Sequence, residues 1–255
     1  MNDTSERFVF VTQLDELYVY HFFNEFNYLL KKNKLWKNKE IIIINLPNFN
    51  ESVFSNLKRF YDFYRLIDTS ILIMKVLFHK FITKRLLKLK KSYSKIGIKI
   101  INLNSINSAE FAQFIQKSST KVISISAPQI FSKELLNLNN ISFFNVHCSP
   151  LPSYKGMMPN FWQMYFDENY TAVTLHKMEE KIDKGDILHQ IVFPLSKSIS
   201  LHQTMINSKL FSAHLINEYF MDTGNSKNKK LKENYFSFPK KQNGLKFKSN
   251  GGKIF

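Results

Sequence analysis

Short apolar runs alternate with segments of helical apolar spacing along the first half of the chain. Residues 8–12 form an apolar run typical of a strand, and residues 18–30 carry apolar side chains three and four positions apart. Residues 40–45 contain four consecutive isoleucines, which indicates a strand buried on both faces. Further strands are predicted at 98–103, 121–126 and 143–146, and a helix at 108–116. This order predicts an α/β fold with a doubly wound, mostly parallel Rossmann-like sheet.

The second half of the chain departs from this alternation. Residues 171–176 and 187–193 are separated by a short turn, which predicts an antiparallel addition to the sheet. Nearer the C-terminus, the alternation around 235–238 and the turn residue Gly244 predict a short helix followed by an edge β-hairpin. We therefore divide the chain into a main domain at 1–200 and an extension at 201–255. The extension carries more apolar side chains than an exposed hairpin should show, which predicts a homodimer built on Tyr235, Phe236, Phe238 and Phe247.

The composition excludes several classes of protein. A chain of 255 residues with 44% hydrophobic residues can bury a sizeable core, which excludes disorder for most of it. The start is polar and the longest apolar runs are far shorter than a membrane span, so we expect a cytoplasmic protein. The single cysteine, Cys148, excludes an internal disulfide and cysteine-rich zinc sites. The first glycine is Gly97, which excludes a phosphate-binding P-loop or a dinucleotide fingerprint after the first strand.

A formal net charge of +16 favours anionic partners such as nucleic acid, an acidic lipid surface or a phosphorylated small molecule. Basic residues cluster at 84–91 and 227–232. The first cluster continues an amphipathic pattern, for which we favour a helix with a solvated lysine face over a helix at a membrane surface. The apolar positions of that pattern are Ile71, Leu72, Met74, Val76, Leu77, Phe81, Leu86 and Leu87.

Three polar residues are candidates for chemistry. Asn145 and His147 end the strand at 143–146, and ligands of such sheets bind outside the carboxyl ends of the strands. Asp183 precedes Gly185 in a predicted tight turn. Each has a structural explanation by itself, but together an amide, an imidazole and a carboxylate can catalyse acyl transfer without a metal. Cys148 alternates to the opposite side from His147, so we interpret it as a buried spectator thiol.

The motif FNVHCSPLPSYKG, followed by MPNFW, VTLHKMEEKIDKGDILHQ and YFSFP, resembles the folate-dependent formyltransferases. That family shares Asn-x-His-x-Ser-x-Leu-Pro-x-Tyr-x-Gly and a downstream Asp-x-Gly. The resemblance is strong from about residue 123 to residue 190 and implies the formyltransferase fold, with Asn145, His147 and Asp183 as catalytic residues. Lys155 and Pro150 depart from the family's usual arginine and leucine.

The resemblance also implies a reaction and a set of binding residues. A formyl group passes from the co-substrate N10-formyltetrahydrofolate to an amine, with Asn145 and protonated His147 stabilising the oxyanion and Asp183 orienting the proton relay. The donor is expected between the loop after residue 126 and the loop at 179–182. Expected donor contacts are Ser126, Ala127, Ile130, Glu179 and Ile182. Expected acceptor contacts are Lys155, Met157, Pro159, Trp162 and His176.

Family members formylate glycinamide ribonucleotide, methionyl-tRNA or nucleotide-linked amino sugars. The chain lacks the glycine-rich start of the first group, and the residues after about 200 are too few for the C-terminal barrel of the second. It looks most similar to the sugar N-formyltransferases of surface-polysaccharide pathways, such as lipopolysaccharide O-antigen biosynthesis, so we expect a nucleotide-linked amino sugar as partner and neither nucleic acid nor membrane. A methionyl-tRNA enzyme, an inactive RNA-binding module and a membrane-peripheral structural protein remain alternatives.

Overall fold

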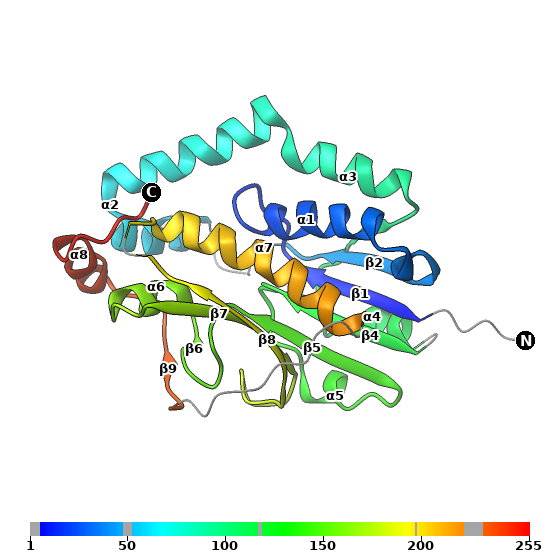
Figure 1. Cartoon of the computed structure of the whole chain (residues 1–255). Helices are drawn as coiled ribbons and strands as arrows, with labels where there is room; N and C mark the ends of the chain where they lie inside the picture. Colours follow the sequence, from blue (N-terminus) through cyan, green and yellow to red (C-terminus); the bar gives the residue numbers. More distant parts are fainter. Residues whose placement is uncertain (1–5, 48–52, 117–118, 197, 222–231) are drawn as a thin grey trace, which may run out of the picture.

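A computed structural model describes residues 6–47, 53–116, 119–196, 198–221 and 232–255 (Figure 1). Most of the basic cluster at 227–232 lies outside these residues. Within the described part, seven strands form the central sheet in the order β3-β2-β1-β4-β5-β7-β8. They are β1 (Arg7–Thr12), β2 (Glu40–Asn45), β3 (Lys99–Asn102), β4 (Thr120–Ile125), β5 (Ile141–His147), β7 (Tyr170–Lys177) and β8 (Ile187–Pro194).

The pairing of the strands confirms the predicted fold class. Strands β3, β2, β1, β4 and β5 run parallel, whereas β7 pairs antiparallel with β5 and β8 pairs antiparallel with β7. The antiparallel addition was therefore predicted correctly. Because the parallel strands point the same way, their carboxyl ends share one edge of the sheet, where a site was expected.

Helices cover both faces of the sheet. On one face lie α1 (Val19–Lys32), α3 (Arg85–Lys95) and α7 (Leu201–Phe220), and on the other lie α4 (Ala109–Ile115) and α5 (Lys133–Leu136). A hydrophobic core lies on each face of the sheet, and alternate residues of β2 point into one or the other. Ile41 and Ile43 lie in the first core, and Ile42 and Ile44 lie in the second. This two-sided burial explains the run of isoleucines. A 3-10 turn, Lys34–Asn38, links α1 to β2.

A third core cluster holds the C-terminal region against α6 (Pro159–Tyr165). The predicted hairpin is wrong: β9 (Tyr235–Phe236) pairs with β6 (Lys155–Gly156), and Gly244 lies inside α8 (Lys241–Ser249). A Cβ at Gly244 would lie 2.7 Å from the Phe63 carbonyl oxygen, so glycine permits the close approach of α8 to α2. Phe247 is buried, and Phe236 and Phe238 pack against the same cluster, whereas Tyr235 is 60% exposed. Most of the apolar surface on which the dimer was predicted is therefore covered within the chain.

The chain between β2 and β3 forms an arch of helices along the upper rim of the view in Figure 1. It comprises α2 (Val53–Leu77), which is kinked at Arg65, a π-helical turn (Phe78–Thr83) and α3. Several apolar residues of the predicted amphipathic pattern, Met74, Leu77, Phe81 and Leu87, are exposed rather than buried. The lysines of the basic cluster at 84–91 are exposed, as expected for a helix with a solvated lysine face, but these apolar residues are exposed as well.

Candidate active site

The carboxyl end of β5 places Asn145 and His147 beside residues of β7. In the antiparallel register Asn145 lies opposite His176, and His147 lies opposite Thr174. Asn145 and His147 point to the same side of the sheet because they are two positions apart. The strand therefore presents an amide and an imidazole together at the sheet edge, as the sequence predicted.

The turn after β7 brings Asp183 back to the same edge. Asp183 adopts a left-handed backbone conformation with φ of 53°. Gly185 lies so close to the end of β7 that a Cβ there would be 1.9 Å from the Lys177 carbonyl oxygen. Only glycine fits this approach, which explains the Asp-x-Gly pattern in physical terms.

Four groups surround the two carboxylate oxygens of Asp183. The Gly156 N–H donates to Oδ2 at 2.9 Å, and His147 Nδ1 lies 3.5 Å from the same oxygen. The Asn145 amide nitrogen donates to Oδ1 at 3.4 Å, and His176 Nε2 lies 3.6 Å from that oxygen. Asn145 and His147, the two residues predicted to act with Asp183, thus both lie next to its carboxylate.

His176 fixes the orientation of the Asn145 amide. Its Nδ1–H donates to the Lys177 carbonyl oxygen at 2.7 Å, so its Nε2 is free to accept a hydrogen bond. The Asn145 Nδ2 group lies 3.1 Å from that nitrogen and is the donor. The two hydrogens of the amide nitrogen are therefore directed at His176 Nε2 and at Asp183 Oδ1. The second hydrogen bond, at 3.4 Å, is the weaker one, so its hydrogen is the one available to a nearby oxyanion.

The tautomer of His147 follows from its backbone contact. Its Nε2–H donates to the Tyr154 carbonyl oxygen at 2.8 Å, which leaves Nδ1 as the basic nitrogen facing Asp183. Burial lowers the pKa of His147 below its ordinary value of 6.5, although the Asp183 carboxylate acts in the opposite direction. The resting imidazole is therefore neutral at pH 7, and the protonated form expected beside the oxyanion requires proton uptake during the reaction.

Asp183 is a stable carboxylate despite its burial. Burial alone would raise its pKa, but His147, His176 and the Gly156 N–H outweigh this and lower the pKa to about 2. A permanent negative charge thus faces the basic nitrogen of His147. Proton uptake by that nitrogen would create an ion pair in a site shielded from water.

The turn after β5 is held by a network that joins β7 and β8. The buried Thr174 hydroxyl donates to the Ser149 carbonyl oxygen at 2.6 Å and accepts from the Leu151 N–H at 3.3 Å. Gln190 donates to the same hydroxyl at 2.8 Å and to the Leu151 carbonyl oxygen at 2.9 Å. Because Tyr154 and Gly156 follow this turn, the network positions the two backbone groups that contact His147 and Asp183.

A cleft of about 670 Å³ opens over these residues. This is a volume that suits a sizeable small molecule. Asn145, His147 and Asp183 line it, as do the predicted binding residues Ser126, Ala127, Ile130, Ile182, Met157 and Pro159. The loop after β4 and the loop before Asp183 thus border one cleft, as expected for the donor.

The remaining predicted binding residues do not line this cleft. Glu179 is exposed outside it, and the Trp162 indole N–H donates to the Ser237 carbonyl oxygen. His176 lies behind Asn145 rather than at the surface of the cleft. The Lys155 ammonium pairs with Glu233 at 2.9 Å and borders a neighbouring pocket instead. In the described residues Lys155 therefore has an acidic partner where an acceptor phosphate was predicted.

Sequence reasoning missed Lys209, a buried lysine of α7 that lines the cleft. Its ammonium donates to the Ser126 hydroxyl at 2.5 Å and lies 3.7 Å from Cys148 Sγ. Cys148 is half-buried and also lines the cleft, so it is not the fully buried spectator that alternation predicted. No local motif marks Lys209, because its place depends on how α7 packs across the sheet.

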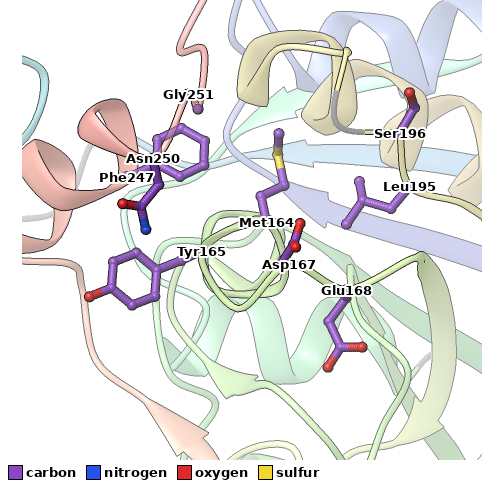
Figure 2. A pocket seen from close by; sticks show the side chains of 10 residues that line it. Met164, Tyr165, Asp167, Glu168, Leu195, Ser196, Phe247, Asn250 and Gly251 are labelled. Carbon is purple, nitrogen blue, oxygen red and sulfur yellow. The ribbon is translucent and has the colours of Figure 1, made fainter.

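A second, smaller cavity of about 180 Å³ lies at α6 and the end of α8 (Figure 2). Tyr165, Glu168 and Phe247 are among its lining residues, and Asn145, His147 and Asp183 are not. Among the residues that the structure describes, no cluster of three or more metal-ligating side chains occurs. In that part of the chain, no helix has the length and apolar content to cross a membrane.

Comparison with known proteins gives a family match. The family model described as Formyl transferase matches residues 51–214, which is more than half of the chain. A methionyl-tRNA formyltransferase of Chlorobium limicola is 31% identical over 99 residues, covering 39% of this chain and 31% of that protein. The chain spans only 19% to 34% of the length of the first three curated relatives it matches.

Solved structures share the fold. A sugar N-formyltransferase from Shewanella sp. FDAARGOS_354 has a TM-score of 0.57 at 17% identity and covers 91% of this chain and 76% of that chain. An N-formyltransferase from Helicobacter canadensis, in complex with folinic acid and dTDP-3-aminofucose, has a TM-score of 0.53 at 19% identity, covering 91% of this chain and 71% of that chain.

Proposed function

Because the chain belongs to the formyl transferase family, we propose that it transfers the formyl group of N10-formyltetrahydrofolate to the amine of a nucleotide-linked amino sugar. The observation that carries the proposal is the meeting of Asn145, His147 and Asp183 at one cleft. These are the groups that acyl transfer to an amine requires: an oxyanion donor, a base and a carboxylate.

The proposed mechanism begins with neutral His147. As the acceptor amine forms a bond to the formyl carbon, the carbonyl oxygen becomes an oxyanion, and the Nδ2 hydrogen that Asn145 shares weakly with Asp183 at 3.4 Å turns toward it. His147 Nδ1 takes the proton lost by the amine, and the imidazolium is stabilised by Asp183 at 3.5 Å. The same proton passes to N10 of the donor as the carbon–N10 bond breaks, which restores the neutral imidazole.

The amino-sugar acceptor is supported by the fold neighbours and by the cleft. Two of the solved structures with this fold are named sugar N-formyltransferases, and a third holds dTDP-3-aminofucose. Lys209 is the one lysine among the described residues that line the cleft, and in this proposal it replaces Lys155 as the cation nearest the acceptor. Such an enzyme would serve surface-polysaccharide biosynthesis in the cytoplasm; a homodimer stays a prediction.

Methionyl-tRNA is the second candidate acceptor, because curated relatives at 31% and 35% identity are methionyl-tRNA formyltransferases. The two candidates are separated by incubating the protein with the formyl donor and either a panel of amino-sugar nucleotides or methionyl-tRNA. Mass spectrometry should detect a gain of one formyl group on a sugar nucleotide. Formylation of the tRNA alone would contradict the sugar acceptor but not formyl transfer, whereas transfer to neither would contradict both.

A further inference from the structure

The arch formed by α2, the π-helical turn and α3 exposes an unusual apolar surface. Its large apolar side chains are between 43% and 74% exposed, and we call them the outer face: Leu66, Ile67, Ile73, Met74, Leu77, Phe78, Phe81 and Ile82. Their spacing of three and four positions places them along one side of the helix. A helix packed on a protein normally turns such a side inward, and here it faces solvent.

The inward side of the same arch carries both apolar and polar side chains: Leu72 and Leu86 pack against the buried clusters, and basic side chains stand between them in sequence. Lys75, His79 and Arg85 are only partly exposed, and Lys75 lies 5.9 Å from the ring centroid of Phe255. Arg85 lies 5.1 Å from the ring centroid of Tyr20 on α1. The segment thus carries apolar side chains on its outward side as well as its inward side. Packing among the described residues does not cover the outer face, which has the character of a surface that contacts another apolar environment.

The charge of the segment has one sign beyond Asp68, whose carboxylate pairs with Lys248. Residues 69–109 contain nine lysines and arginines and no aspartate or glutamate. Lys80, Lys84, Lys88, Lys90 and Lys91 are exposed close to the outer face in sequence. The arch forms the upper rim of the molecule, so nothing in the described chain lies beyond it in Figure 1.

We propose that the outer face binds an anionic lipid bilayer, with its apolar side chains at the boundary of the acyl region and its lysines among the headgroups. Amphipathic helices with basic flanks bind bilayers in this way, because apolar burial and attraction to anionic lipid add. The proposal concerns a surface distinct from the catalytic cleft and does not depend on the acceptor. It departs from the expectation that the protein has no membrane partner.

Charge and apolar exposure together favour an anionic bilayer over two other partners, a second copy of the chain and RNA. A second copy of the chain packed face to face would oppose lysine with lysine, and residues 69–109 supply no carboxylate to compensate. RNA would satisfy the lysines but would leave the side chains of Phe78, Phe81 and Ile82 without an apolar environment. An anionic bilayer satisfies both kinds of side chain at once.

The test is co-sedimentation of the full chain with vesicles of phosphatidylcholine alone and with vesicles containing about a third phosphatidylserine or phosphatidylglycerol, at roughly 0.15 M salt. We expect binding to the anionic vesicles only. The double variant Phe78→Ser/Phe81→Ser should bind at least about tenfold more weakly, because it removes apolar burial. The triple variant Lys80→Gln/Lys84→Gln/Lys88→Gln should bind about a hundredfold more weakly, at roughly fivefold for each cation.

Matched controls separate the arch from the net charge of the chain. Leu35→Ser/Val192→Ser removes two exposed apolar side chains elsewhere, and Lys37→Gln/Lys177→Gln/Lys181→Gln removes three exposed cations elsewhere. Both should retain most of the binding. Equal losses in the control variants, or no binding by the parent protein, would overturn the proposal. So would light scattering that shows a dimer lost in Phe78→Ser/Phe81→Ser, or a salt-sensitive RNA complex that survives in that variant.

Discussion

Two regions of this molecule break the usual rule of polar outside and apolar inside, in opposite directions. At the carboxyl edge of the sheet, His147 and Asp183 are each only 8% exposed. On the outer face of the arch, Ile67 is 74% exposed and Phe81 59%. The buried polar groups are hydrogen-bonded within the chain, whereas the apolar groups of the outer face remain largely exposed among the described residues. The first pattern is typical of a preorganised reaction site and the second of a docking surface.

The largest expected effect is at the buried polar region. His147→Ala should lower turnover by at least about a hundredfold, because it removes the base that takes the amine proton. His214→Ala is the matched control, since His214 is 43% exposed at its side chain on α7 and pairs with Glu25 away from the cleft. Steady-state kinetics and thermal unfolding of both variants check this. Near-normal turnover in His147→Ala would remove the imidazole from the mechanism.

The next largest effect is on the free energy of unfolding, which should respond differently to substitutions in the core and on the outer face. Phe161 is fully buried in the third core cluster, so Phe161→Ala should lower the free energy of unfolding by about 3–5 kcal/mol. Phe81→Ala should change it by less than about 0.5 kcal/mol, because the ring is already exposed. Denaturant unfolding of the two variants compares them. A loss in Phe81→Ala as large as in Phe161→Ala would mean that the outer face is covered in the free protein.

A smaller effect concerns the stability of the protein at low pH, through two histidines near the basic side chains of the arch. Burial, with help from nearby cations, lowers the pKa of His21 and of His202 to about 4 from an ordinary 6.5. The unfolded chain therefore binds more protons than the folded chain between these values, and the free energy of unfolding should fall as pH drops from 6.5 to 4. Unfolding curves at pH 7, 5.5 and 4.5 measure this. In the variant His21→Gln/His202→Gln the free energy of unfolding should fall less steeply with decreasing pH. An equally steep fall would mean that other groups cause the pH dependence.

The central sheet was predictable because its signals are local. Four isoleucines specify a two-sided strand by themselves, and Ser108 caps α4 as expected by accepting from the Phe111 N–H. The meeting of Asn145 and His147 follows from strand periodicity and the rule for parallel sheets. The place of Asp183 rested on the resemblance and on Gly185, whose need to approach Lys177 is visible only in the structure.

The failed predictions depend on contacts between distant parts of the chain. The stretch around Phe236 alternates like a hairpin, but Phe236 pairs with Gly156, eighty residues earlier. Lys209 reaches Ser126 only through the packing of α7 across the sheet. The amphipathic pattern of the arch was visible, but periodicity does not say which side of a helix turns toward the core.

The central claim is that Asp183, through His147 and Asn145, supports formyl transfer. It is tested most directly by transfer of an isotopically labelled formyl group from N10-formyltetrahydrofolate to an amino-sugar nucleotide, comparing the parent protein with Asp183→Asn and with Asp186→Asn on the same turn. Asp186 is exposed and pairs with Lys177, so it serves as the control. We predict labelled product from the parent and Asp186→Asn, and at least about a hundredfold slower transfer by Asp183→Asn with folate binding retained. Equal rates for all three proteins would contradict the account.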